Sequence, residues 1–435
     1  MNAVSWGASF PAGWPHTRIK HVGRFAGGGT PDKGNAAFWN GDIPWVSPKD
    51  MKSATIDDTE DHITMEGLQN SATKLVAPGA VLLVMRSGIL RHTIPVAINR
   101  VPVALNQDMR AISPLPWVEA RFLARLLEGH QQQLLNAWSK VGSTVESLES
   151  DLVRETEIAI PPLRQQRAIA DYLDHETARL AALVAAKERV LGLLAEKRRA
   201  LITRAVTRGL DPRAPLRDSG IPWLGEIPVH WVATRLKFVA DVRGGITIGQ
   251  RYSTTDLIEM PYLRVANVQD GRLDLREVAT VLVPRDEAAA CMLEAGDVLM
   301  NQGGDADKVG RGCVWRGEIE RCLHQNHVFA VRPRRVLSDW LNIWTSTDGA
   351  KAFFEGRAKQ STNLASISAT NINELPIPLP PPKEQSAIVE QMNDASEKLD
   401  LMRAATERTI ALLRERRAAL IAAAVTGQID VESAA

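Results

Sequence analysis

The chain has 435 residues, 45% of them hydrophobic and 24% charged, with a formal net charge of +1 at pH 7. This length predicts two to four domains, and the balanced charge excludes a molecule that attracts nucleic acid or membrane over its whole surface. The three cysteines, Cys291, Cys313 and Cys322, form no CxxC pair, which favours a reducing compartment. The start of the chain lacks the pattern of a signal peptide, and the apolar runs are too short to cross a bilayer. We therefore expect a cytoplasmic protein with no membrane partner.

Residues 1–157 predict an α+β globule. They are rich in Gly, Pro and Trp, and they contain short apolar runs instead of long periodic stretches. The run VLLVM at 81–85 predicts a short strand, and the segment 118–138 has helical patches. The order of the strands cannot be read from one sequence.

Residues 158–211 predict a long helix. Apolar residues at 169, 173, 180, 183, 191, 194 and 201 recur at spacings of three, four or their sums, and positions 164–207 contain no proline. Such a helix would be about 66 Å long and could not be stable in water through propensity alone. Pro161 and Pro162 precede its predicted start, and Gly209 and Pro212 follow its end. The narrow apolar stripe requires a partner helix.

Residues 212–376 predict a second globule of the same kind. A faint repeat relates it to the first at a shift of 217 residues. The repeat includes Gly27-Gly28 against Gly244-Gly245, PGAVL at 78–82 against AGDVL at 295–299, and Pro11, Trp14, Thr17, Arg18, Lys20 and Val22 against Pro228, Trp231, Thr234, Arg235, Lys237 and Val239.

Residues 377–435 repeat the helix. Positions 158–211 align with 377–430 at a shift of 219 without a gap, and roughly two positions in five are identical. The second copy is the obvious partner for the first, as an antiparallel coiled coil. The sequence thus predicts an α+β protein with two pseudo-repeated globules separated by two long helices that form this coiled coil.

Several segments resemble the specificity subunit of type I restriction–modification systems. The resemblance rests on the helix entries IAIPPLRQQRAIADYLD and IPLPPPKEQSAIVEQMN and on DSGIPWLGEIPVHW at 218–231, and it covers nearly the whole chain in order. The first helix entry departs from the pattern, because Gln165 stands where an acidic residue usually precedes the final Gln. The first globule also has only a shortened form of the SGIPWLGEIP segment.

The resemblance implies that residues 1–157 and 212–376 are target-recognition domains, each reading one half of a bipartite site in double-stranded DNA. Residues 158–211 and 377–435 would be conserved spacer helices that set the gap between the halves. They would dock two methyltransferase subunits, and restriction/translocase subunits would join the complex. The chain itself would be non-catalytic and without a cofactor. The methyl donor would be on the methyltransferase, and ATP and Mg would be on the restriction subunit.

Motif absences agree with this implication. The chain contains no Asn or Asp followed by Pro-Pro and an aromatic residue, which is the adenine methyltransferase signature, and no GxxxxGK[ST] phosphate loop. These absences favour a protein that reads DNA over one that modifies it.

Candidate DNA contacts lie in loops that recur in both globules. The glycine-rich loops GGGTPDKG at 27–34 and RGGITIGQR at 243–251 could bring backbone N–H groups close to phosphate. Asn106 and Gln107 align with Gln325 and Asn326, and amide side chains can pair with adenine. The alternative is that these segments are plain turns. The full set of candidates is Thr30, Lys33, Lys49, Arg86, Asn106, Gln107, Arg243, Thr247, Arg251, Arg264, Asn267, Asn301, Gln302, Gln325, Asn326 and His327.

Two patterns suggest metal chemistry instead. Asp32, Asp50 and Lys52 match the loose PD…(D/E)xK pattern of a self-contained nuclease. The simpler interpretation places both carboxylates in ordinary loops. Cys322, His324 and His327 could bind zinc, but they lack a fourth ligand nearby and their segment, CLHQNHVFAV, predicts a strand.

The late part of each helix carries basic residues: Lys197, Arg198, Arg199, Arg204 and Arg208 in the first copy, and Arg414, Arg416 and Arg417 in the second. They would either complement the helix dipole or contact the DNA backbone. An orphan DNA-binding regulator that pairs through its helices remains the third interpretation of the whole chain.

Overall fold

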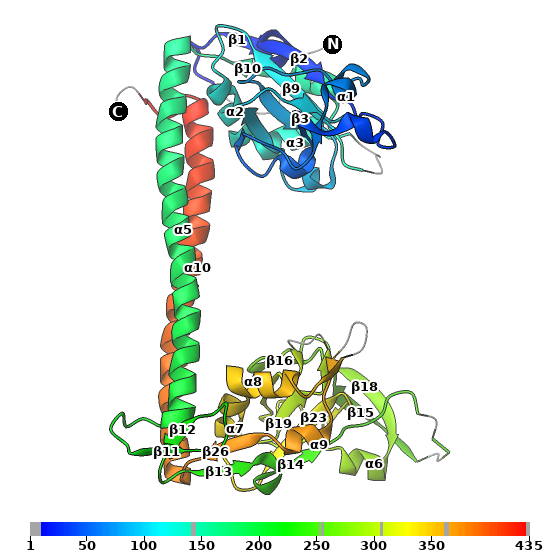
Figure 1. Ribbon diagram of the computed structural model, residues 1–435, viewed down its shortest axis with the longest axis vertical. Helices are drawn as coiled ribbons and strands as arrows, with labels where there is room; N and C mark the ends of the chain where they lie inside the picture. Colours follow the sequence, from blue (N-terminus) through cyan, green and yellow to red (C-terminus); the bar gives the residue numbers. More distant parts are fainter. Residues whose placement is uncertain are drawn as a thin grey trace. The chain divides into compact units, whose positions relative to one another are not determined.

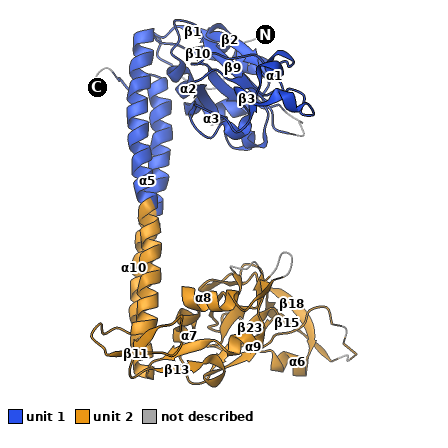
Figure 2. Ribbon diagram, viewed as in Figure 1, with its two compact units in different colours: residues 1–188, 407–435 blue, residues 189–406 orange. Residues whose placement is uncertain are grey.

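The computed structural model describes residues 10–140, 145–250, 252–253, 256–304, 308–360 and 365–431. The chain forms two compact units (Figure 2): unit 1 comprises residues 1–188 and 407–435, and unit 2 comprises residues 189–406. Both long helices are therefore divided between the units. No helix in the described ranges has the length and apolar character that a membrane span requires.

The globular part of unit 1 contains a five-stranded sheet of order β2-β9-β6-β7-β4. All four residues of β6 are buried, which explains why this strand is an unbroken apolar run. A smaller sheet has the order β5-β3-β8, and its strands β3 and β8 run parallel. The elements are β1 (His16–Arg18), β2 (Gly23–Gly27), β3 (Trp39–Val46), β4 (Thr55–Ile56), β5 (His62–Ile63), α1 (Met65–Gln69), β6 (Val81–Val84), β7 (Val96–Asn99), β8 (Ala104–Leu105), β9 (Met109–Pro114), α2 (Ala120–Gly129), α3 (Gln131–Trp138), α4 (Ser150–Glu155) and β10 (Glu157–Ala159).

The globular part of unit 2 has the same plan. Its main sheet has the order β14-β23-β19-β21, and a smaller sheet has the order β18-β15-β22 with β15 and β22 parallel. The elements are β11 (Leu216–Asp218), β12 (Glu226–Pro228), β13 (Val232–Arg235), β14 (Ala240–Arg243), β15 (Leu257–Leu263), β16 (Val268–Gln269), β17 (Arg272–Leu273), β18 (Ala279–Pro284), α6 (Arg285–Ala290), β19 (Val298–Asn301), β20 (Gly303–Gly304), β21 (Gly312–Val314), β22 (Leu323–His324), β23 (Val328–Pro333), α7 (Ser338–Thr345), α8 (Asp348–Glu355), β24 (Lys359–Gln360), β25 (Ala365–Ser366), α9 (Ala369–Asn373) and β26 (Pro376–Leu379).

The two globular parts are copies of one α+β fold, as the faint repeat predicted. The first four strands of the unit 1 sheet, β2-β9-β6-β7, correspond in order to β14-β23-β19-β21 of unit 2. In both units an antiparallel strand pair precedes the long helix: β1 with β10, and β13 with β26.

The long helices are α5 (Leu163–Arg208) and α10 (Pro382–Val425), so the predicted helix over 164–207 is confirmed to within one residue at each end. They pack side by side and antiparallel within each unit (Figure 1). In unit 1, Arg414 forms an ion pair of 2.9 Å with Glu188. In unit 2, Arg198 donates two hydrogen bonds, of 2.8 and 3.2 Å, to the carboxylate of Asp400.

The seam between the helices follows a heptad pattern. Among the less exposed positions of α5, one series alternates in steps of four and three, at 173, 177, 180, 184, 187, 191, 194, 198 and 201. The prediction that position 183 lies in the apolar stripe is wrong, because Leu183 is 44% exposed and its repeat partner Met402 is 54% exposed. Val184 fits the heptad spacing instead, since it lies four positions after Leu180 and three positions before Lys187.

A buried glutamine fixes each helix to its globular part. Gln166 accepts a hydrogen bond from the Glu119 N–H (2.8 Å) and donates to the carbonyls of Trp117 (3.0 Å) and Pro161 (2.7 Å). Its repeat partner Gln385 accepts from the Leu337 N–H (2.9 Å) and donates to the Pro380 carbonyl (2.8 Å). The final Gln of the helix-entry motif thus holds the start of each long helix against its globular part.

Candidate nucleic-acid interface

In each unit a three-residue turn connects the short parallel strand to the main sheet. We call residues 106–108 the hub turn of unit 1 and residues 325–327 the hub turn of unit 2. The predicted strand over CLHQNHVFAV is therefore wrong in detail, because the chain turns between β22 and β23. Parallel pairing of β3 with β8, and of β15 with β22, brings the ends of these strands together at one edge. The loops that follow them therefore meet.

Three equivalent backbone hydrogen bonds hold neighbouring segments around the hub turn in both units. The first residue of the turn donates to the end of the parallel strand: Asn106 N–H to the Val46 carbonyl, and Gln325 N–H to the Leu263 carbonyl, both 2.9 Å. The third residue accepts from the residue that follows the central strand: Asp108 from Met85 (2.7 Å), and His327 from Gln302 (2.9 Å).

The third bond comes from the glycine-rich loop. Gly29 N–H donates to the Leu105 carbonyl (2.9 Å), and Ile246 N–H donates to the His324 carbonyl (2.8 Å). A Cβ added to Gly28 would lie 1.8 Å from the Asn106 carbonyl oxygen, and one added to Gly245 would lie 2.0 Å from the His324 oxygen. Glycine is required at these positions because backbone packs directly on backbone. Loop packing thus explains Gly28 and Gly245, whatever the loops bind, whereas an added Cβ on Gly244 would meet nothing within 4 Å.

Exposed side chains surround the hub turn of unit 1. The Thr30 hydroxyl donates to the side-chain oxygen of Gln107, and this contact joins the glycine-rich loop to the turn. Arg86 Nε donates to Asp108 (2.6 Å), and Arg86 is 54% exposed. A hollow of about 600 Å³ opens here, and its lining includes Arg86, Gln107 and Arg110. Lys33 is also exposed.

The hub turn of unit 2 has a comparable set. The His327 side chain is exposed, and its Nδ1 lies 3.2 Å from Oε1 of Gln302. Gln325 and Asn326 are half-buried, while Arg243 and Thr247 are exposed. Arg251 lies outside the described residues.

Arg264 follows the parallel strand of unit 2 and lines a hollow of about 470 Å³ together with Arg276. Its Nε is buried and has no hydrogen-bond partner among the described residues. This donor and Oδ1 of Asn301 are buried polar atoms without a partner in this part of unit 2.

Three predicted contact residues lie inside the fold, which corrects the sequence analysis. Asn106 is 6% exposed, and its side-chain oxygen accepts from the Asp108 N–H (3.0 Å). Asn267 is 2% exposed, and it accepts from the Arg264 N–H and donates to two loop carbonyls. Asn301 ends β19 instead of following it, and it donates to the Val268 carbonyl (3.0 Å). The bonds of Asn106 and Asn267 are made within the loops, and burial at these positions argues against contact with DNA. Asn301 is equally buried, but its Oδ1 has no partner among the described residues.

Lys49 is exposed but already paired. It lies 2.9 Å from the carboxylate of Asp61 and 3.3 Å from that of Glu60. The hydrogen bond to Asp61 and the weaker one to Glu60 raise the pKa of Lys49. The two carboxylates reduce the attraction that this charge would exert on phosphate.

The nuclease and zinc patterns have structural explanations. Both Asp50 oxygens accept hydrogen bonds, one from the N–H and hydroxyl of Ser47 and the other from the Glu60 N–H, so Asp50 caps a short helical turn. His324 is buried, with Nδ1 2.6 Å from the Val328 carbonyl, and burial lowers its pKa. In the described parts of the chain, no three His, Cys, Asp or Glu side chains gather as a metal site would require.

Asp108 and Arg110 were not among the predicted contact residues, but the structure places both in the lining of the hollow in unit 1. Asp108 aligns with His327 at the same shift that aligns the rest of the hub turn, so the repeat contained the signal. The repeat gives no comparable signal for Arg110. Its place beside the hollow depends on the pairing of β9 with β6, which no local pattern predicts.

The chain matches the family model for the type I restriction modification DNA specificity domain twice, over residues 11–190 and 228–410. The EcoR124I/EcoR124II specificity subunit of Escherichia coli is 38% identical over 157 residues, which are 36% of this chain and 39% of the relative. The EcoKI specificity subunit of Escherichia coli K12 is 22% identical over 97% of this chain and 90% of its own length.

Two solved structures share the fold. One, described as the structural basis of complex assembly and conformational transition of the type I R-M system, gives a TM-score of 0.73 at 18% identity. It covers 97% of this chain and 99% of the other. The HsdS subunit from Thermoanaerobacter tengcongensis gives a TM-score of 0.55 at 17% identity, covering 97% and 98%.

Proposed function

Since the chain belongs to the family of type I restriction–modification DNA specificity proteins, we propose that it reads a bipartite site in double-stranded DNA. Each hub turn and the loops around it would contact one half of the site. The observation that carries this proposal is the loop arrangement built twice, with the same three backbone hydrogen bonds and different exposed side chains. A shared frame with different side chains suits two different half-sites.

We further propose that the coiled coil docks two methyltransferase subunits and that restriction subunits join the complex. The names of the relatives, all specificity subunits of type I restriction enzymes, support this assignment. The chain would supply neither the methyl donor site nor the nuclease. Purified chain with magnesium and DNA should accordingly leave the DNA uncut.

The direct test substitutes hub-turn side chains in one unit at a time. Gln107→Ala should relax the base preference of one half-site, and Asn326→Ala with His327→Ala should relax the other, by about 1–3 kcal/mol for each hydrogen-bonded base that the variant no longer reads. Sequencing of methylated sites in host DNA would report both half-sites and the gap. Equal relaxation of both halves by either variant would contradict the proposal.

A separate test concerns the spacer role. Removing seven residues, two helical turns, from each long helix shortens it by about 10 Å, which equals about three base pairs of duplex. We expect methylated sites with a correspondingly shorter gap and unchanged half-sites. An unchanged gap would exclude the helices as the spacer.

A further inference from the structure

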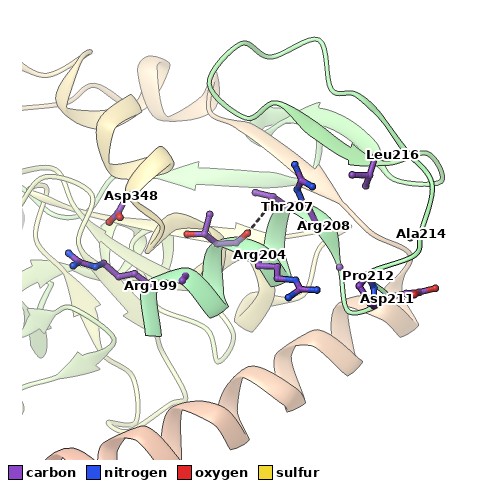
Figure 3. A pocket seen from close by; sticks show the side chains of 12 residues that line it. Arg199, Arg204, Thr207, Arg208, Asp211, Pro212, Ala214, Leu216 and Asp348 are labelled. Atoms are coloured by element: carbon purple, nitrogen blue, oxygen red, sulfur yellow. Dashed lines mark hydrogen bonds between the residues drawn. The ribbon is translucent and has the colours of Figure 1, made fainter. Parts of the chain in front are cut away.

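The C-terminal end of α5 forms one wall of an open hollow in unit 2. The hollow has a volume of about 580 Å³, and its lining includes Arg199, Arg204 and Arg208 together with Thr203 and Thr207 (Figure 3). All three arginines are exposed. Arg208 lies 3.5 Å from Glu226, but both side chains are more than half exposed, so the pair is weak. No described residue forms an ion pair with Arg199 or Arg204.

Comparison with the other helix copy shows that this face is not part of the common scaffold. On the buried side, Ala205 and Val206 are identical to their repeat partners Ala424 and Val425, and all four are buried. On the exposed side the charged positions differ, although Ala200 and Thr207 of the hollow have the identical partners Ala419 and Thr426. The partners of Arg199, Thr203, Arg204 and Arg208 are Ala418, Ala422, Ala423 and Gly427.

The charge of the two helix ends differs accordingly. Residues 197–213 contain six basic side chains and one acidic, a net charge of +5, whereas residues 416–432 contain two basic and two acidic, a net charge of zero. A requirement for solubility or for a helix dipole would apply to both copies alike. The difference therefore points to a ligand of unit 2.

In unit 1 another helix covers the corresponding surface of α10. There the end of α2 packs on α10, and a Cβ added to Gly129 would lie 3.2 Å from the backbone of Ala422. Alanine at 422 permits this close approach. Unit 2 has a hollow over the equivalent positions, and arginines line it.

The three arginines are spread around the helix as well as along it, which favours a polyanion over a single phosphate: at about 100° per residue, Arg199 lies about 180° around the helix from Arg208. From Arg199 to Arg208 the helix rises about 13 Å, which is the axial length of about four base pairs. Two carboxylates also belong to the lining, Asp348 from α8 and Asp211 beyond the helix end (Figure 3). Around the helix, Thr203 and Thr207 lie between Arg199 and the other two arginines, and the lining of the hollow carries both signs of charge with the cations in excess.

We propose that the face formed by Arg199, Arg204 and Arg208 is a sequence-independent binding site for the phosphates of DNA. It rests on the proposed function, since it adds backbone contacts outside the two hub turns. Guanidinium groups bind phosphate oxygens with paired hydrogen bonds, and each neutralised phosphate releases counterions. The site strengthens binding without reading bases.

The test measures DNA affinity of the full-length chain, in complex with its methyltransferase, over a series of salt concentrations. The variant Arg199→Ala, Arg204→Ala, Arg208→Ala should lower the slope of log K against log salt by about 2–3, at about 0.9 for each phosphate contact. Affinity for a target duplex and for an unrelated duplex should fall by the same factor. Alanine preserves helix propensity, and circular dichroism checks the fold.

Two controls make the result specific. Arg199→Lys, Arg204→Lys, Arg208→Lys keeps the charge and should keep most of the slope. Arg179→Ala, Arg189→Ala, Arg408→Ala removes the same charge from exposed helix positions outside the hollow and should change the slope little.

The outcomes separate the two proposals. A wild-type chain that binds no DNA overturns both. Wild-type binding with an unchanged slope in the triple alanine variant overturns the phosphate site alone. Unchanged DNA binding with loss of a protein subunit would also overturn it, because the face would then bind an acidic protein surface.

Discussion

Gly245 offers a sharp test of how the interface is built. The glycine-rich loop of unit 2 approaches the hub turn so closely that a Cβ at position 245 would lie 2.0 Å from the His324 oxygen and 2.6 Å from the Gln325 oxygen. Its neighbour Gly244 has nothing within 4 Å of an added Cβ. Gly245→Ala and Gly244→Ala therefore make the same chemical change in very different surroundings.

The cost follows from the geometry. Real Cβ contacts essentially never fall below 3.0 Å, so the alanine must move the loop away by at least 3.0 − 2.0 = 1.0 Å. That shift breaks the 2.8 Å hydrogen bond from Ile246 N–H to the His324 carbonyl. Overpacking of about 1–3 kcal/mol and a broken hydrogen bond of about 1 kcal/mol together destabilise unit 2 by about 2–4 kcal/mol.

Two assays check this prediction. Denaturant unfolding should show a lower midpoint for Gly245→Ala than for Gly244→Ala, which should match the wild type closely. DNA binding by Gly245→Ala should lose discrimination at one half-site and retain it at the other. Equal midpoints for the two variants would refute the close packing, and loss at both half-sites would refute the independence of the two hub turns.

Three further predictions concern stability. Gln385→Leu leaves the part-buried Leu337 N–H and the buried Pro380 carbonyl without their side-chain partner and should cost about 1–3 kcal/mol in denaturant unfolding, whereas a cost near zero would exclude this role of Gln385. The Arg198–Asp400 pair is partly exposed, so a double-mutant cycle should give a coupling below about 1 kcal/mol that salt weakens; a larger, salt-independent value would contradict this. Because burial lowers the pKa of His324 below 6.5, the unfolded chain takes up a proton that the folded chain does not. Stability should therefore be present above about pH 6.5 and fall as the pH drops, and His324→Asn should reduce this dependence in unfolding midpoints between pH 7.5 and 5.

The helices could be predicted from the sequence because their determinants are local. Prolines, glycines and apolar spacing lie along one continuous segment, and the observed α5 differs from the predicted helix by one residue at each end. The error at Leu183 shows the limit of this reasoning. Leu183 and Val184 are adjacent apolar residues, and only the heptad spacing of the packed helices decides that Val184 is the less exposed of the two.

The interface could be predicted only in outline. The repeat pointed to loops that the structure brings together around each hub turn, but it could not show that Asn267 and Asn301 are buried. An amide in a loop satisfies backbone groups as readily as it reads a base. The parallel pairing that brings the loops together joins strands far apart in sequence, Trp45 with Ala104 and Tyr262 with Leu323, and such pairings leave no local pattern.

The division of the chain into units has a consequence for its biosynthesis. Unit 2 is one continuous stretch, whereas unit 1 needs residues from both ends of the chain. Its core combines Trp14 with Ile421 and Val425, and the helix end near Gly427 packs against Pro11. During translation, unit 2 can therefore close while unit 1 still waits for the last helix to leave the ribosome. A circularly permuted gene that begins near residue 407 would join residues 407–435 to residues 1–188, so that unit 1 is continuous as well and is the first to leave the ribosome.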